Sequence, residues 1–156
     1  MDGGLTLDVA VAARTDIDAS DWRAAVRAAC RPLVDAGAFE QRYADRCVTI
    51  IEEHGPYVVL APGIALAHAR PEDGVRRLGL AAAVLREPVS FGHPENDPVD
   101  LVLAFGSPDP QSHVGLLSAL ARHLVADLAE RLRSAASDAE ARRMLQEVVS
   151  DATDRE

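Results

Sequence analysis

The chain has 156 residues, a formal net charge of −9 at pH 7 and a hydrophobic content of 48%, with only 4% aromatic residues. That length is enough for one domain with its own core, and Ala, Leu and Val must supply most of that core. The negative charge argues against nucleic-acid binding, because the nucleic-acid phosphates would be repelled. No apolar run reaches the roughly 18 residues of a membrane span, and residues 1–6 lack the features of a signal peptide, so we predict a cytoplasmic protein.

Motifs for the common metal and nucleotide sites are missing. The sequence has no HExxH or HxH pattern, no Cys/His cluster and no GxxxxGK[ST] loop, so we expect no metal, no cofactor and no direct use of ATP. Cys30 and Cys47 are too far apart for a CxxC pair and fall in predicted helices. We therefore expect both thiols to be free, buried and reduced.

The first third of the chain predicts a short strand followed by two helices. Residues 7–12 alternate in the manner of a strand. A helix is expected from about Asp21 to Ala36, where Pro32 removes one amide donor and should kink or loosen the last turn. A second helix is expected from about Glu40 to His54, with Gly55 as its stop.

The middle of the chain contains apolar runs bounded by Gly, Pro, Asn and Asp, which predict further strands. These strands are expected at residues 57–60, 78–86 and 99–105. Residues 91–98 are dense in turn-forming types and predict a loop. Four strands are therefore visible, and we expect an edge strand near residues 75–78 or Val89.

The last third predicts helices with recognisable starts. Ser112 is expected to cap a long helix, and Asp127 to restart the helix after a bend near Ala126. Ser137 and Glu140 form a capping box that opens the last helix.

The mixture of strands with one-sided helices predicts an α/β fold of three layers, in which a mixed sheet of about five strands is covered by helices on both faces. We place this single domain at residues 1–150 and expect residues 151–156 to form a frayed tail.

A lone histidine, His68, stands in the most informative stretch, GPYVVLAPGIALAHARPEDG at residues 55–74. A histidine beside an apolar run is more often structural than catalytic. With Arg70 two residues later, however, the ring is also well placed to hold an anion. The residues by themselves leave both interpretations open.

The string GIALAHARPEDGV resembles the active-site segment of the enzyme IIA domains of the bacterial phosphoenolpyruvate-dependent sugar phosphotransferase system (PTS). It is most similar to the type-2, mannitol/fructose superfamily and to its ascorbate-type branch. The resemblance continues over most of the chain, through DWRAAVRAACRPLVDAGAFEQRY, LREPVSFG, NDPVDLVLAF and SHVGLLSALARHL. It implies the mannitol/fructose-type IIA fold, in agreement with the residue pattern, and a phosphotransferase with a phosphohistidine intermediate.

His68 matches the phosphorylated histidine of that family. Imidazole suits the role, because it is a strong nucleophile when neutral near pH 7 and a good leaving group afterwards. The resemblance implies that the histidine-containing phosphocarrier protein HPr donates the phosphoryl group. A IIB component then accepts it, which couples the protein indirectly to sugar uptake through a membrane IIC component.

His113 matches the second active-site histidine of the family. It falls in the first turn of the helix capped by Ser112, where free amides and the helix dipole favour an anion. Ser112 offers a hydroxyl to phosphate, although N-capping by itself explains this residue. Arg70 has two interpretations of equal weight: a phosphate-orienting contact, or a solvated cation that pairs with Glu72 or Asp73.

Two positions depart from the family pattern. Ala67 replaces the proline that usually precedes the histidine, which predicts a more mobile His68. The mannitol branch tends to carry an arginine near the end of the helix before the central strand, where this chain has Glu52 and Glu53. Either Arg70 replaces that arginine, or the phosphate site is weaker than in the mannitol branch.

The leading prediction is a phosphoryl carrier for sugar transport, with ascorbate indicated by the resemblance. The alternative is a regulatory IIA-like protein whose histidine phosphorylation controls binding to a target. For partner docking we expect an apolar patch near residues 61–66 and 114–117, with Leu116 exposed. A homodimer is left open.

Overall fold

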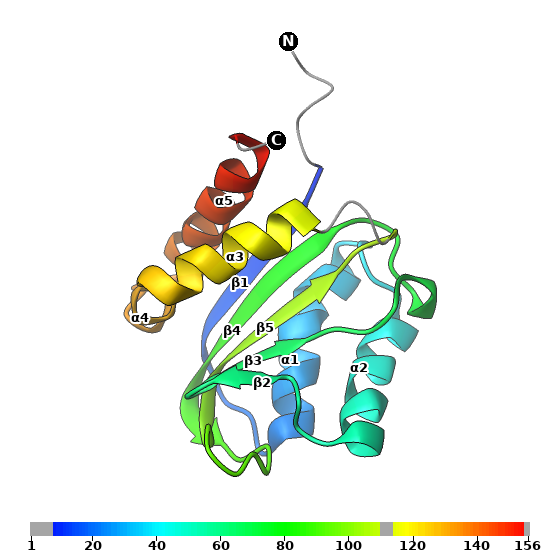
Figure 1. Ribbon diagram of the computed structural model, residues 1–156, viewed down its shortest axis with the longest axis vertical. Helices are drawn as coiled ribbons and strands as arrows, with labels where there is room; N and C mark the ends of the chain where they lie inside the picture. Colours follow the sequence, from blue (N-terminus) through cyan, green and yellow to red (C-terminus); the bar gives the residue numbers. More distant parts are fainter. Residues whose placement is uncertain (1–7, 110–113, 155–156) are drawn as a thin grey trace.

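The computed structural model describes residues 8–109 and 114–154, which form three layers (Figure 1). A five-stranded mixed sheet lies between two helical layers, as predicted. Helices α1 (Trp22–Asp35) and α2 (Gln41–His54) cover one face. Helices α3 (Val114–Ala126), α4 (Leu128–Arg133) and α5 (Asp138–Asp154) cover the other.

The sheet has the strand order β1-β4-β5-β3-β2. Its strands are β1 (Ala10–Ile17), β2 (Val59–Ala61), β3 (Ile64–Ala67), β4 (Gly79–Val89) and β5 (Val99–Gly106). The pairs β1–β4 and β3–β5 are parallel, whereas β2–β3 and β4–β5 are antiparallel. A short 3₁₀ helix, η2 (Pro71–Asp73), follows β3.

The strands differ from the prediction at three places. The first strand extends to Ile17, five residues beyond its predicted end. The fifth strand is β3, which Gly63, with a φ of 78°, separates from β2 by a tight turn. Val75 forms only an isolated bridge with Phe39, and Val89 belongs to β4, so the predicted edge strand was wrong. The edges of the sheet are β1 and β2.

The helix starts agree with the capping signals. The Asp21 carboxylate accepts the Ala24 amide at 2.9 Å, and α4 restarts directly after Asp127. The Ser137 hydroxyl likewise accepts the Glu140 amide, at 3.1 Å.

The C-terminal ends of two helices are more regular than the sequence predicts. The last turn of α1 is intact beyond Pro32, whose carbonyl accepts the Ala36 amide at 3.0 Å. Helix α5 continues through residues 151–154, where a frayed tail was expected. Ala152 is buried in the core on that side, and this contact gives the extra turn an apolar anchor.

The two faces of the sheet carry side chains of different size. Alternation along each strand sends successive residues to opposite faces. The face under α1 and α2 is lined near its centre by alanines: Ala65, Ala67, Ala81, Ala83 and Ala104. The face under α3, α4 and α5 carries larger residues: Leu66, Leu80, Leu101, Leu103 and Phe105. Each fully buried leucine contributes roughly 2 kcal/mol by its removal from water.

Cys30 and Cys47 are free and buried in the α1–α2 layer, as predicted. Their mutual contact, together with burial, raises the pKa of the Cys47 thiol. Both thiols therefore belong to the core.

Gly79 and Gly106 are paired across β4 and β5, and the ring of Phe39 lies over them. A Cβ atom on Gly106 would stand 2.7 Å from Phe39 Cε1, and one on Gly79 would stand 3.1 Å from the same atom. The glycines therefore let an aromatic ring approach the end of the sheet.

We expect Gly106→Ala to lower the free energy of unfolding by about 1–3 kcal/mol, because the new methyl group overlaps the Phe39 ring. Gly79→Ala should cost less. Urea unfolding measures both changes. In a Phe39→Leu background the loss caused by Gly106→Ala should shrink, since contacting residues are coupled. An undiminished loss there would show that the ring is not the cause.

Candidate active site

His68 is the first residue after β3 and lies at the end of the sheet where β3 and β5 both stop. Ala67, directly before it, is buried and paired with Ala104 of β5. The strand ladder therefore restrains the backbone that leads into His68, although the usual proline is missing.

The imidazole of His68 has a defined hydrogen-bond partner. Its Nδ1 lies 3.1 Å from the carbonyl oxygen of Leu66. Because a carbonyl can only accept, Nδ1 carries the proton, and Nε2 of the neutral ring keeps its lone pair. The ring is half-buried and stands edge-on to Tyr57, with ring centroids 6.1 Å apart. This arrangement orients a nucleophilic nitrogen.

A cleft of about 220 Å³ lies beside His68. Its lining comes from the ends of β3 and β5, the loop after β3 and the start of α3: Leu66, His68, Ala69, Pro71, Phe105, Ser107 and Leu117. The walls are largely apolar, with the imidazole and Ser107 as polar side chains. Such walls strengthen the interaction between a polar side chain and a small anion.

The loop after His68 is held by a buried hydroxyl group. Tyr43 Oη, from α2, donates to the carbonyl oxygen of Phe105 at 2.7 Å and accepts the amide of Ala69 at 2.9 Å. Burial raises the pKa of the Tyr43 phenol, so the group stays neutral. The helical spacing placed Tyr43 on an apolar face. No signal in the sequence showed that this position needs the hydroxyl of a tyrosine and not only an aromatic ring.

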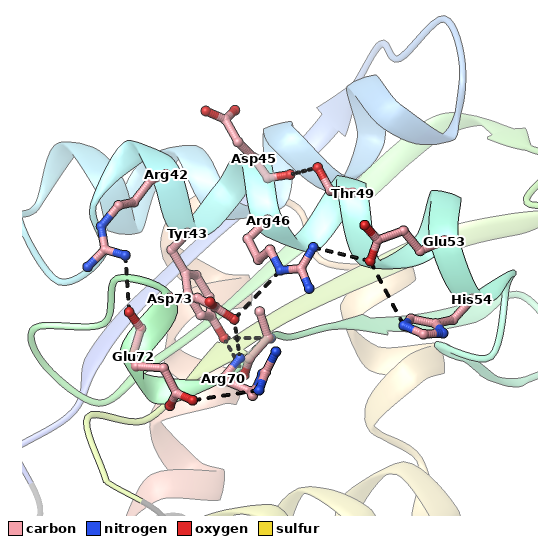
Figure 2. Close-up of polar contacts among 11 residues, drawn as sticks. Arg42, Tyr43, Asp45, Arg46, Thr49, Glu53, His54, Arg70, Glu72 and Asp73 are labelled. Atoms are coloured by element: carbon pink, nitrogen blue, oxygen red, sulfur yellow. Dashed lines mark hydrogen bonds and ion pairs between the residues drawn. The ribbon is translucent and has the colours of Figure 1, made fainter.

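Two arginines of α2 also contact this loop (Figure 2). Arg42 Nη1 donates to the carbonyl oxygen of Glu72 at 3.0 Å. Arg46 lies between Glu53 and Asp73, at 3.3 Å and 4.0 Å from their carboxylate oxygens. The sequence analysis assigned neither arginine to the site.

The side chain of Arg70 does not line the cleft. Its guanidinium is exposed and pairs with Glu72 at 3.9 Å, and its amide donates to the Asp73 carboxylate at 3.0 Å. Arg70 is also absent from the described lining of the cleft. In the structure the Arg70 guanidinium therefore forms an ion pair with Glu72, outside the lining of the cleft.

Ser112 and His113, the two other predicted site residues, lie outside the described residues. Helix α3 begins at Val114, immediately after them, and Leu117 in its first turn lines the cleft.

The other described histidines have structural partners. His93 Nδ1 accepts the amides of Glu95 and Asn96, and His123 Nε2 lies 3.2 Å from Asp151. His54 ends α2 and lies 3.9 Å from Glu53. None of these three rings lines the cleft beside His68.

Within residues 8–109 and 114–154, no group of three or more His, Cys, Asp or Glu side chains could hold a metal ion. No helix in the same part of the chain has both the length and the apolar character needed to cross a membrane.

The expected docking patch is wrong at its centre. Leu116 is fully buried, and Ile64 and Leu66 are also buried in the same core. The large apolar side chains that are exposed include Tyr57, beside His68, Leu60 on the edge strand β2, and Val114 at the start of α3. We call these three residues the apolar rim.

Sequence comparison gives a consistent result. The sequence model described as "Phosphoenolpyruvate-dependent sugar phosphotransferase system, EIIA 2" matches residues 10–148. The ascorbate-specific PTS system EIIA component of Shigella boydii is 41% identical over 106 residues, which cover 67% of this chain and 69% of that protein.

Comparison with solved structures agrees. A putative PTS IIA protein (PtxA) from Streptococcus mutans superposes with a TM-score of 0.77 at 31% identity, over 91% of both chains. Enzyme IIA for mannitol from Escherichia coli, solved in complex with phosphorylated enzyme IIB, superposes with a TM-score of 0.71 at 25% identity, over 86% of this chain and 94% of that one.

The match to the family model over most of the chain, the identity to a curated relative and the shared fold lead to one conclusion. This chain belongs to the EIIA 2 family of the phosphoenolpyruvate-dependent sugar phosphotransferase system.

Proposed function

We propose that His68 Nε2 carries the phosphoryl group in this phosphotransferase component. The observation that supports this most is the contact of Nδ1 with the Leu66 carbonyl oxygen at 3.1 Å, beside an apolar cleft. That contact leaves Nε2 as the nucleophile. It also gives the ring a fixed acceptor for its remaining N–H once Nε2 is phosphorylated.

The proposed reaction consists of two phosphoryl transfers, and each one breaks a bond to phosphorus as another forms. The P–N bond of the donor's phosphohistidine breaks as a bond forms between phosphorus and Nε2, and the donor imidazole is released. In the second transfer the bond to Nε2 breaks, and the acceptor takes the phosphoryl group. Positioning and charge stabilisation supply most of the catalysis of such transfers. The apolar walls of the cleft favour both, because they exclude water that would hydrolyse the intermediate.

His113 and Ser112 complete the proposed site. A neutral His113 ring at the start of the helix would donate an N–H to a phosphoryl oxygen, and Ser112 would contribute its hydroxyl or cap the helix. Arg70 is a weaker candidate for phosphate orientation, since its guanidinium already pairs with Glu72. Support for His113 comes from its place directly before α3, whose first turn lines the cleft.

The proposed partners follow from the family. HPr is the donor, a IIB component is the acceptor, and the link to a membrane IIC component is indirect, all on the cytoplasmic side. The mannitol IIA relative was solved with its phosphorylated IIB. The relative from Shigella boydii is ascorbate-specific, which favours ascorbate as the transported substrate and transport over a regulatory role.

The first experiment removes the nucleophile. Incubated with phosphoenolpyruvate, enzyme I and HPr, the protein should gain one acid-labile, base-stable phosphoryl group, and His68→Ala should gain none. His54→Ala, which removes an exposed histidine elsewhere, is the matched control and should be labelled like the wild type. Mass spectrometry and NMR of the labelled ring should place phosphorus on Nε2. Labelling of His68→Ala would overturn the assignment.

The second experiment tests His113. His113→Ala should accept phosphate on the order of 10²-fold more slowly, because one preorganised donor to the phosphoryl oxygens is lost. It should also pass phosphate onward poorly. His113→Gln retains a donor and should recover part of both rates. Wild-type rates in His113→Ala would reduce His113 to a helix-start residue without a catalytic role.

The third experiment tests the apolar rim. Leu60→Glu places a charge on an exposed position, so it should slow transfer to and from the partner proteins while thermal stability stays nearly unchanged. Leu116→Glu buries a charge and should unfold the protein. Transfer rates and thermal melts separate the two effects. Unchanged transfer by Leu60→Glu would exclude this rim position from the interface.

A further inference from the structure

We propose that Tyr43 is the positioning residue for the reactive histidine, an inference that rests on the proposed role of His68. Tyr43 lies on α2, 25 positions before His68, and does not line the cleft. Its hydroxyl nevertheless joins the residue after His68 to the end of β5.

The Tyr43 hydroxyl donates one hydrogen bond and accepts another. A phenol has one hydrogen to donate, and Tyr43 donates it to the Phe105 carbonyl oxygen at 2.7 Å. The same oxygen accepts the Ala69 amide at 2.9 Å. Burial raises the pKa of the phenol, so both roles persist at neutral pH. The ring itself is fully buried and packs against Phe39, with centroids 4.5 Å apart.

The two residues that Tyr43 joins belong to the same cleft. Ala69 and Phe105 both line it. The backbone ladder between β3 and β5 ends at the Ala67–Ala104 pair. The hydroxyl therefore continues the connection beyond the ladder, one residue past His68 on one side and one residue past Ala104 on the other. The distance between these two segments determines where the His68 ring stands in the cleft.

The remaining contacts between α2 and the loop lie closer to solvent. Arg42 reaches the Glu72 carbonyl and Arg46 reaches Asp73 (Figure 2). The side chain of Arg42 is 60% exposed, and contacts of this kind contribute little. The hydroxyl of the buried Tyr43 is the contact from α2 that reaches the residue directly after His68.

Loss of the hydroxyl would leave the Ala69 amide and the Phe105 carbonyl without this partner. An amide away from water rarely stays unpaired, so the loop would shift until water or another group satisfied the Ala69 amide. Such a shift moves the backbone on one side of His68 while Leu66, on the other side, stays in β3. The contact between Nδ1 and the Leu66 carbonyl would loosen, and the neutral ring would populate both tautomers.

The decisive variant is Tyr43→Phe, which keeps the ring and removes only the hydroxyl. We expect phosphoryl acceptance from phospho-HPr to slow about tenfold, since small displacements of a reacting group have large effects on rate. The ¹⁵N shifts of the His68 ring should change from one tautomer to a mixture, and the Ala69 amide should exchange with solvent faster. The matched control is Val148→Ala, which removes buried atoms from the opposite core. It should lose stability yet keep the wild-type rate and tautomer.

The outcomes separate this inference from the proposed function. If the wild type is not labelled at all, the proposed function fails. The tautomer of His68 and the exchange rate of the Ala69 amide need no phosphorylation, so they still test whether Tyr43 positions the ring. If the wild type is labelled and Tyr43→Phe matches Val148→Ala in rate and tautomer, Tyr43 is only a core residue. Should Tyr43→Phe unfold, the comparison is made with trimethylamine N-oxide, which favours the compact state. In the wild type, an Ala69 amide that exchanges as fast as an open loop would also overturn the inference.

Discussion

The parallel pairing of β3 with β5 is the constraint on which the site depends. It brings the end of a four-residue strand, and hence His68, level with the end of β5. Phe105 and Ser107 then meet Leu66 and the loop after His68 around one cleft. Without this register, Phe105 and Ser107 would not line the cleft beside the imidazole. Both faces of β3 are buried, and a slip of one residue would move Ile64 and Leu66 onto the face that packs alanines, so side-chain size determines the register.

The difference in side-chain size between the two faces of the sheet also helps to form the site. Alanines at the centre of the α1–α2 face leave room for the bulky rings of Phe39 and Tyr43. The approach of α2 allows the Tyr43 hydroxyl to reach the backbone at the end of β5. The larger residues of the other face fill the space under α3, α4 and α5. The rings of Phe39 and Tyr43 thus pack where the sheet carries alanine and glycine.

Most of the fold could be predicted because its signals are local. The apolar periodicity, together with Asp21, Asp127 and Ser137, located the helices closely. The strand predictions were weaker, because a short apolar run does not reveal its partner. The residues around Gly63 read as one strand and a second apolar run, whereas pairing makes them two separate strands. Leu116 was expected at the surface because it neighbours the site in sequence, but its position on α3 turns it into the core.

The sequence by itself determined the helices with their caps and the three-layer class, and it predicted the reactive group, because each depends on residues close together in the chain. It also carried the family resemblance, through short strings around His68. Only the tertiary structure decided the strand order, the burial of Leu116 and the contacts of the Tyr43 hydroxyl. The Tyr43 hydroxyl meets groups 26 and 62 positions away, and no spacing rule links residues that far apart. A phenol on an apolar helix face looks like any other core ring until folding brings a backbone amide and a carbonyl to its oxygen.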